Sequence, residues 1–400
     1  AIIDTMMHEQ QRQRVFEVAK SALIVLSAYD EMQLSGDMAA PFLQESSFWW
    51  LTGIEEAGWK LILDGSRKKS TLVRPARSQV DVVFNGRMTD QQVREVSRID
   101  RIIDIDDFEK ELRQLRRHHS IVQTIDNIHY GDTMHLNPAQ NELNKTLKRI
   151  FDSVQSCNQM IAGLRAIKQP EELKCMQKAI DVTVRAFQDV REILDSCRSE
   201  NEIEAEFTYR FRRADALHAY EPIVASGKNA CTLHYIANNA KVGARDMVLI
   251  DIGARVDGYS ADITRTYCRN PTKRQRAVHE AVLRAQKKVI ALITPGLPVS
   301  EYVKKGDMIM REALHDLGLL DDLSDDSTFR KYFPHAMSHG LGVDTHDSLG
   351  SPRWLEVGMV ITVEPGIYIE EEGIGVRIED DILVTNDGSR NLSGALSTAL

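Results

Sequence analysis

Four acidic residues occupy matching places in two predicted strand pairs of the C-terminal half. Asp251 and Asp262 flank the turn-like RVDG, while Glu364 and Glu379 flank EEEG. If each turn closes at its centre, between 256 and 257 and between 371 and 372, the acids of each hairpin lie opposite one another on one face. The surrounding strands are apolar (VLIDIG, MVITVEPG, VRIEDDILV), so these carboxylates are expected to be buried.

Buried carboxylates this close repel one another strongly unless a cation lies between them. A lone Asp in VLIDIG would be interpreted as a turn or capping residue. Four acids at mirror positions on apolar strands instead favour a metal site.

A histidine-rich segment, PHAMSHGLGVDTHD, contains His335, His339 and His346. Taken singly, each would be a core histidine; beside four carboxylates, metal ligation or catalysis is favoured. His339 stands between Ser338 and Gly340, whose small size lets a ligand approach closely. Four carboxylates and one imidazole favour a harder ion such as Mn²⁺. Bridging carboxylates can hold two ions about 3.5 to 4 Å apart, which share the hydroxide that performs hydrolysis.

The elements that carry these residues occur in a repeated order of helix, helix and strand pair. The helices are predicted over 170–197, 199–217, 273–292 and 299–317, and the strand pairs lie in MVLIDIGARVDGYSADITRTY and MVITVEPGIYIEEEGIGVRIEDDILVT. Ser199 and Glu202 predict a capping box at the second helix. This repetition suggests an internal duplication with pseudo-two-fold symmetry, and its seam is a natural place for a site.

The N-terminal part mixes short strands and helices, which is typical of an α/β domain. Strands are predicted in SALIVLSA, WKLILDG, KSTLVRPA, VDVVFNG and SIVQTID, and helices near 90–97, near 108–117 and from Asn137-Pro138 onward. The predicted domains are 1–158 and 159–400, and the fold class of the whole chain is α+β.

Composition excludes several classes of function. The net charge of -9 and the pI near 5.8 argue against nucleic acid or an anionic membrane as a partner. No apolar run reaches the roughly 18 residues of a membrane helix, and AIIDTMMHEQQRQR lacks a secretory pattern. Five widely spaced cysteines without a C-x-x-C pair indicate a reducing cytoplasm.

The segments IDIGARVDGYSADITRT, HAMSHGLGVDTHD, TVEPGIYI and GVRIEDD, with His234-Tyr235, resemble the M24 metallopeptidases. These are creatinase-like "pita-bread" enzymes that include aminopeptidase P, prolidase and methionine aminopeptidase. SSFWWLTGIEEAGWKLIL and LRAIKQPEELKCMQKA resemble the N-terminal domain and interdomain helix of aminopeptidase P, which methionine aminopeptidase lacks. The resemblance implies a creatinase-like α/β domain followed by a duplicated pita-bread domain.

The resemblance also implies two divalent ions, Mn²⁺ first, with Co²⁺ or Zn²⁺ as alternatives. Asp262 and Glu379 would bridge them, Asp251 would complete one site, and His339 with Glu364 the other. The resemblance implies that Glu364 is also the proton shuttle and that His335 is catalytic. It implies that His346 contacts the substrate and stabilises the tetrahedral intermediate, and that His234 lies in the proline pocket. Tyr368 and Arg377 would be supporting or substrate-contacting residues.

The expected activity is cleavage of the N-terminal Xaa-Pro bond of peptides. The alternatives are a prolidase that accepts only dipeptides, a metal-free binding module and a creatinase-type amidinohydrolase. Ala336 and Thr345 depart from the family pattern, and SLGSPRW lacks a tyrosine frequent in aminopeptidases P. A homodimer or homotetramer is expected from the resemblance and from Phe48, Trp49 and Trp50 at the surface, with burial of these rings as the alternative.

Overall fold

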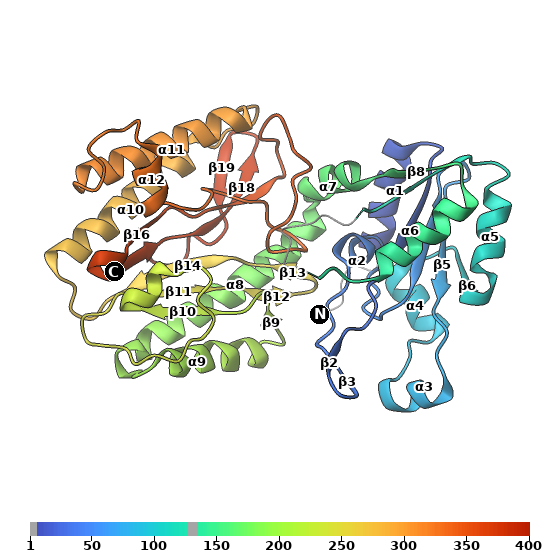
Figure 1. Cartoon of the computed structure of the whole chain (residues 1–400), viewed down its shortest axis with the longest axis horizontal. Helices are drawn as coiled ribbons and strands as arrows, with labels where there is room; N and C mark the ends of the chain where they lie inside the picture. The colour runs from blue at the N-terminus through green and yellow to red at the C-terminus, as the bar shows by residue number, and fades with distance from the viewer. Residues whose placement is uncertain (1–5, 127–134) are drawn as a thin grey trace. The chain divides into compact units, whose positions relative to one another are not determined.

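The computed structural model describes residues 6–126 and 135–400. The chain divides into two compact units, residues 1–164 and 165–400 (Figure 1). This division falls inside helix α7 (Asn158–Ala166), whereas the predicted boundary falls at its first residue.

The first unit is built on a mixed six-stranded sheet with the strand order β6-β5-β4-β1-β7-β8. Its strands are β1 (Leu23–Ser27), β4 (Lys60–Asp64), β5 (Lys69–Arg74), β6 (Arg101–Asp104), β7 (Ile121–Thr124) and β8 (Ser153–Ser156), with a separate small hairpin of β2 (Gln33–Ser35) and β3 (Met38–Ala39). Its helices are α1 (Met7–Ala19), α2 (Ser46–Thr52), α3 (Gln79–Asn85), α4 (Asp90–Ser97), α5 (Phe108–Leu115) and α6 (Ala139–Ile150). Leucine, valine and phenylalanine side chains of the central strands, α5 and α6 form one buried cluster, which confirms an α/β domain.

The prediction of a strand in VDVVFNG is wrong, because this segment forms helix α3. Ser78 and Asp81 make a capping box at its start, and Gly86 ends it at φ 71°. None of its residues is buried, so no sheet contact opposes these local helix signals.

The prediction that Phe48, Trp49 and Trp50 lie at the surface is also wrong. These rings belong to α2, all of whose residues are buried. The His8 ring of α1 packs edge-on against Trp49, with the ring centroids 5.2 Å apart. The aromatic cluster is therefore core and carries no information about oligomerisation.

The second unit repeats the predicted order of two helices and paired strands. The first half contains α8 (Pro170–Ile193), α9 (Glu200–Arg213), β9 (Leu217–His218), β10 (Ile223–Ser226), β11 (Val248–Ile252), β12 (Ala254–Val256), β13 (Tyr259–Ser260) and β14 (Ile263–Tyr267). The second half contains α10 (Lys273–Leu292), α11 (Val299–Asp316), α12 (Asp326–Tyr332), β15 (Val360–Val363), β16 (Gly366–Ile369), β17 (Ile374–Arg377), β18 (Asp380–Thr385) and β19 (Gly388–Asn391). Helices α8 and α9 pack on the first set of strands and α10 on the second (Figure 1).

The predicted capping box of α9 does not form. Ser199 makes no side-chain cap hydrogen bond. Glu202 instead accepts a hydrogen bond from the backbone N–H of Arg198, at 2.7 Å. The helix nevertheless begins at Glu200, directly after Ser199, as predicted.

The first hairpin turns one position later than predicted. Asp257 and Gly258 both have positive φ, 50° and 79°, as the two-residue turns that join twisted strands require. Asp251 therefore pairs with Thr264 and not with Asp262. Asp262 lies two positions from Thr264, so it remains on the same face because side chains alternate along a strand.

The second hairpin has the predicted register. Val363 pairs with Asp380 and Gly366 pairs with Arg377, which places Glu364 opposite Glu379 between the two ladders. The hairpins meet where Thr264 forms an antiparallel bridge with Glu379.

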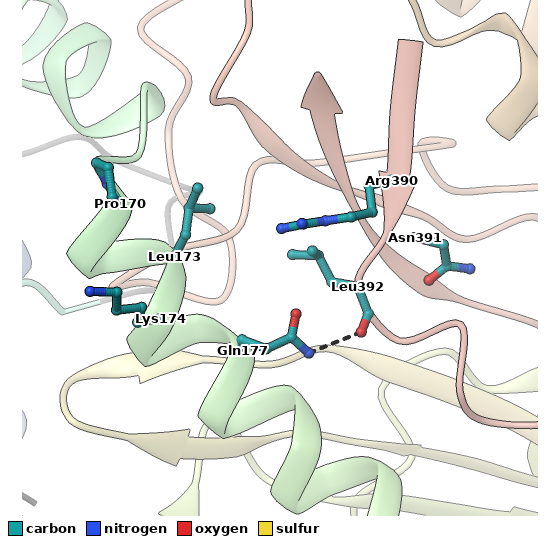
Figure 2. A pocket seen from close by; sticks show the side chains of 7 residues that line it. All are labelled: Pro170, Leu173, Lys174, Gln177, Arg390, Asn391 and Leu392. Atoms are coloured by element: carbon teal, nitrogen blue, oxygen red, sulfur yellow. Dashed lines mark hydrogen bonds between the residues drawn. The ribbon is translucent and has the colours of Figure 1, made fainter. Parts of the chain in front are cut away.

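A cavity of about 490 Å³ lies between α8 and the end of β19. In Figure 2 the side chain of Gln177 reaches across it to the carbonyl of Leu392, a hydrogen bond of 3.1 Å. None of the predicted site residues lines this cavity, so the candidate site is located by its charged groups. Within the described part of the chain, no helix is long and apolar enough to cross a membrane.

Candidate metal centre

The five predicted metal ligands converge in the second unit. They are Asp251 on β11, Asp262 between β13 and β14, His339 in the segment after α12, Glu364 between β15 and β16, and Glu379 between β17 and β18. Their donor atoms form overlapping groups, each within 4.8 Å: Asp251, Asp262 and Glu379; His339, Glu364 and Glu379; and Asp262, His339 and His346.

This spacing fits divalent ions. Atoms that bind one ion at about 2.0 to 2.2 Å lie within roughly 4.4 Å of one another, so small side-chain movements suffice to close each group. Glu379 belongs to two groups, as does Asp262. A carboxylate shared between two groups is placed to bridge two ions.

The charges of the site also favour a bound cation. Asp251, Asp262 and Glu379 are at most 8% exposed. Burial, and then the charges of Asp262, Glu364 and Asp251, raise the pKa of Glu379 well above its ordinary value. Burial also raises the pKa of Glu364, to about 7. Without an ion, the raised pKa values of Glu379 and Glu364 favour their protonated forms, because burial and the neighbouring carboxylates disfavour the charged forms.

His339 presents one ring nitrogen to this cluster. Its Nδ1 lies 2.9 Å from the carbonyl of Gly340 and must be the donor, so Nε2 is the nitrogen that could bind an ion once it has lost its proton. Nε2 lies 3.4 Å from a carboxylate oxygen of Asp262 and 3.4 Å from one of Glu364. Although burial lowers it, the hydrogen bond to Asp262 and the charge of Glu364 raise the pKa of His339 to about 9.

Arg377, Tyr368 and His335 form a hydrogen-bonded chain beside the ligands. Arg377 donates to Asp251 through Nη2 and to the Tyr368 hydroxyl through Nη1, the latter at 2.8 Å. His335 donates from Nδ1 to the Ala336 carbonyl, so its Nε2 accepts the Tyr368 proton at 2.8 Å. Burial and the charge of Arg377 lower the pKa of His335 to about 3, so this ring is neutral.

Tyr220 and Thr264, which the sequence analysis did not single out, both contact the candidate ligands directly. The Tyr220 hydroxyl lies 2.6 Å from Asp251 and 2.6 Å from Asp262. Thr264 donates to Glu379 at 2.6 Å and accepts from Arg377. Thr264 could have been identified from its pairing with Asp251 had the turn centre been placed correctly. Tyr220 precedes β10, a strand whose pairing with β11 was not predicted.

His346 lies beside His339, with their ring centroids 4.4 Å apart. Its side chain is exposed, whereas the next residue, Asp347, is buried and accepts a hydrogen bond from Arg165 at 2.8 Å. Asp347 and Gly340 also form a backbone bridge. The loop is therefore anchored at Asp347 while the imidazole of His346 stays accessible.

His234 lies in the segment between β10 and β11, and its side chain is exposed. Burial, and then the charges of His339 and His234, lower the pKa of His346, which places His234 near His346. The structure thus brings all ten predicted site residues into one region of the second unit.

Comparison with known proteins identifies the family to which this chain belongs. Residues 174–386 match the model of metallopeptidase family M24, and residues 8–123 match the N-terminal domain of aminopeptidase P. The Xaa-Pro aminopeptidase of Haemophilus influenzae is 33% identical, and that of Escherichia coli 32%; each alignment covers 97% of this chain and 94% of the relative.

A solved structure of E. coli aminopeptidase P with the inhibitor Pro-Leu superposes with a TM-score of 0.88 at 29% identity, covering 100% of this chain and 97% of that one. Its fold agrees with the predicted α+β class of two domains. The chain therefore belongs to metallopeptidase family M24, within the group of the Xaa-Pro aminopeptidases.

Proposed function

We propose that this chain removes the N-terminal residue from peptides with proline in the second position, using two divalent ions held by the five converging ligands. The observation that carries the proposal is the cluster of four carboxylates and one free imidazole nitrogen, largely buried and short of positive charge. The carboxylates of such a cluster are all ionised at neutral pH only with cations between them.

The ligand set assigns each ion its residues. We infer that Asp262 and Glu379 would bridge the two ions, because each is a carboxylate that belongs to two of the groups; His339 also belongs to two, but a single ring nitrogen cannot bridge. Asp251 then completes one site, and His339 with Glu364 the other. Mn²⁺ suits this oxygen-rich set. When bound, two such ions lower the pKa of a shared water molecule, so that it is a nucleophile near neutral pH.

The chain's own groups handle the proton and the developing charge. Glu364 lies beside both His339 and His335, at 3.4 and 3.5 Å, and is proposed to accept the proton of the attacking water and pass it to the leaving proline nitrogen. The exposed imidazole of His346 is proposed to donate a hydrogen bond to the carbonyl oxygen as it becomes tetrahedral. His335, Tyr368 and Arg377 hold Asp251 and Glu364 in place, which is their proposed contribution to catalysis.

His234 is proposed to contact the proline ring, as the family resemblance implies; its side chain is exposed, and its charge contributes to the lowered pKa of His346. The inhibitor Pro-Leu of the E. coli enzyme carries proline and one further residue, as does the product of a tripeptide Xaa-Pro-Leu. This favours aminopeptidase activity over a prolidase restricted to dipeptides, and the retained ligands disfavour a binding module or an amidinohydrolase.

The experiment that tests this function is hydrolysis of matched peptides by the Mn²⁺-loaded protein. We expect cleavage of Xaa-Pro-Yaa tripeptides with release of the first residue, and much slower cleavage of Xaa-Ala-Yaa. Cleavage of Xaa-Pro dipeptides alone would establish a prolidase. Metal binding without any cleavage of proline peptides would contradict the proposal.

We also propose a reducing, cytoplasmic location. All five cysteines are unpaired, and Cys157, Cys175, Cys197 and Cys268 are buried, as suits a protein without disulfides. A homodimer or homotetramer remains a proposal from the family resemblance, to be measured by light scattering.

A further inference from the structure

The segment that carries His234 has little regular structure. It runs from the end of β10 to residue 240 and contains one short 3-10 turn, Gly227–Cys231. The side chain of His234 is exposed, so nothing about its own burial fixes its position. Contacts elsewhere in the segment must do so.

One carboxylate collects those contacts. Glu200, at the first turn of α9, is 0% exposed. Its Oε1 accepts from the backbone N–H and hydroxyl of Ser226, at 2.7 and 2.8 Å, and from Asn229 at 3.1 Å. Its Oε2 accepts from the Tyr235 hydroxyl and the Ala240 N–H, both at 2.8 Å. Five donors from both ends and the middle of the segment therefore meet on one side chain.

Backbone contacts reinforce the same anchor. The N–H of Glu200 donates to the Ala240 carbonyl at 3.0 Å, which makes this contact reciprocal. A second tie comes from Asn238, which adopts φ 43° and donates to Glu204 at 2.9 Å. Although burial raises it, hydrogen bonds from Ala240, Asn229 and Ser226 lower the pKa of Glu200, so it stays ionised, with both oxygens able to accept.

The anchored segment leads directly to the site. Tyr235 and Leu233, on either side of His234, pack against a small cluster that includes Tyr368. Tyr368 in turn is hydrogen-bonded to Arg377 and His335. Displacing the segment would therefore move His234 without removing any metal ligand.

We propose that Glu200 is a positioning residue for substrate binding, which acts by holding segment 226–240 so that His234 faces the proline of the peptide. This inference rests on the proposed aminopeptidase function. It concerns a residue that touches neither substrate nor metal and acts through His234.

The test uses the full-length, Mn²⁺-loaded protein and the variant Glu200→Gln. A glutamine keeps the shape but has only one accepting oxygen, so it cannot accept from both the Ser226 and Ala240 amides. We expect kcat/KM for an Xaa-Pro-Yaa peptide to fall by about 10², with unchanged metal content. Amide exchange in segment 226–240 should become faster. Glu202→Gln is the matched control, because Glu202 is exposed, lies two positions further along α9, and accepts its hydrogen bond from the Arg198 N–H, outside segment 226–240.

A double-mutant cycle separates positioning from general destabilisation. If Glu200 acts through His234, Glu200→Gln combined with His234→Ala is no slower than the slower single variant. Multiplying losses, or unchanged exchange in the segment, would overturn the inference. If Glu200→Gln does not fold, Tyr235→Phe replaces it, because this change removes one of the five donors to Glu200. We expect Tyr235→Phe to lower kcat/KM by less, and to lower it no further when His234 is already alanine. A full additional fall in kcat/KM in the double variant would overturn the inference as well.

Failure of the proposed function is a separate result. A wild-type protein that binds Mn²⁺ but cleaves no proline peptide would refute the substrate, and with it the role of Glu200 in substrate binding. An active wild type with additive losses in the cycle refutes the positioning role alone.

Discussion

Arg377 pairs with Asp251 across the junction of the two hairpins. The guanidinium comes from the end of β17 and the carboxylate from β11, and they are 4% and 8% exposed. Arg377 also donates to Tyr368. Burial lowers the pKa of Arg377, but Tyr368, Asp251 and Glu379 outweigh it and raise the pKa above its ordinary value. This buried ion pair links the two halves of the duplicated unit even before a metal binds.

Replacing Arg377 by glutamine should destabilise the metal-free protein strongly. Asp251 would be left buried without a charged partner, which costs about 3 to 5 kcal/mol of unfolding free energy. Arg274→Gln is the control, since its pair with Glu372 is about one third exposed and worth at most about 1 kcal/mol. Denaturant unfolding in chelator checks this. An equal loss of unfolding free energy in the two variants would show that the Arg377–Asp251 pair stabilises the fold no more than the Arg274–Glu372 pair.

Removal of the metals should abolish activity. Dialysis against a chelator is expected to stop peptide cleavage, and Mn²⁺ or Co²⁺ should restore it best, because the nucleophile requires ions at the five ligands. Persistence of full activity in chelator would contradict the two-ion site.

Metal binding should release protons. In the metal-free protein the pKa of His339 is raised to about 9, so the ring is protonated at pH 7, yet it must be neutral to bind an ion. Metal and proton therefore compete, and Mn²⁺ affinity should fall as pH falls below about 9. Calorimetric titration in buffers of different ionisation enthalpy counts the protons, and pH-independent binding without proton release would contradict this assignment.

Two substitutions should separate a bridging ligand from a catalytic residue. Asp262→Asn removes charge between both ions, so metal content should drop steeply. His346→Ala should keep the metals but lower kcat by about 10² to 10³, because one transition-state hydrogen bond is lost, with little change in KM. Metal analysis and measurement of kcat check both expectations. A fully metallated Asp262→Asn would show that Asp262 is not a bridging ligand, and a normal kcat in His346→Ala would show that His346 is not catalytic.

The first unit should lose stability in mild acid because of His8. This ring is 1% exposed, and its Nε2 has no hydrogen-bond partner among residues 6–126 and 135–400. Burial lowers the pKa of His8 from 6.5 to about 4, so between these values the unfolded state binds more protons than the folded one. Stability is therefore complete above pH 6.5 and falls as pH falls toward 4, by about 2 kcal/mol between pH 7.5 and 5.

His8→Asn is the matched variant for this prediction. Its side-chain amide can still donate to the Trp50 carbonyl, which His8 contacts at 3.0 Å, but it does not titrate. Tryptophan fluorescence isolates the first unit, because Trp49, Trp50 and Trp59 are buried there and only Trp354 lies elsewhere. The variant should lose about 2 kcal/mol less than the wild type over the same pH interval, and parallel pH profiles would refute the role of His8.

The sequence by itself indicated the candidate metal ligands and the duplicated architecture. Acidic residues on apolar strands cannot be buried without compensation, so Asp251, Asp262, Glu364 and Glu379 indicated a cation before any fold was known. The register of the second hairpin also followed from sequence symmetry, because its turn closes at the midpoint. Local patterns of charge and periodicity are sufficient for such inferences.

Tertiary structure alone decided the contacts between segments distant in sequence. The sequence predicted Asp262 as the strand partner of Asp251, but because the turn lies at Asp257-Gly258, the partner is Thr264. Tyr220 reached the ligands through a strand whose pairing depends on the whole sheet. From the sequence, Trp49 and Trp50 could lie in the core or at the surface; the structure shows that α1 packs against the helix that carries them. These contacts join residues 13 to 42 positions apart, and only the packed chain, which brings buried polar groups to their partners, determines them.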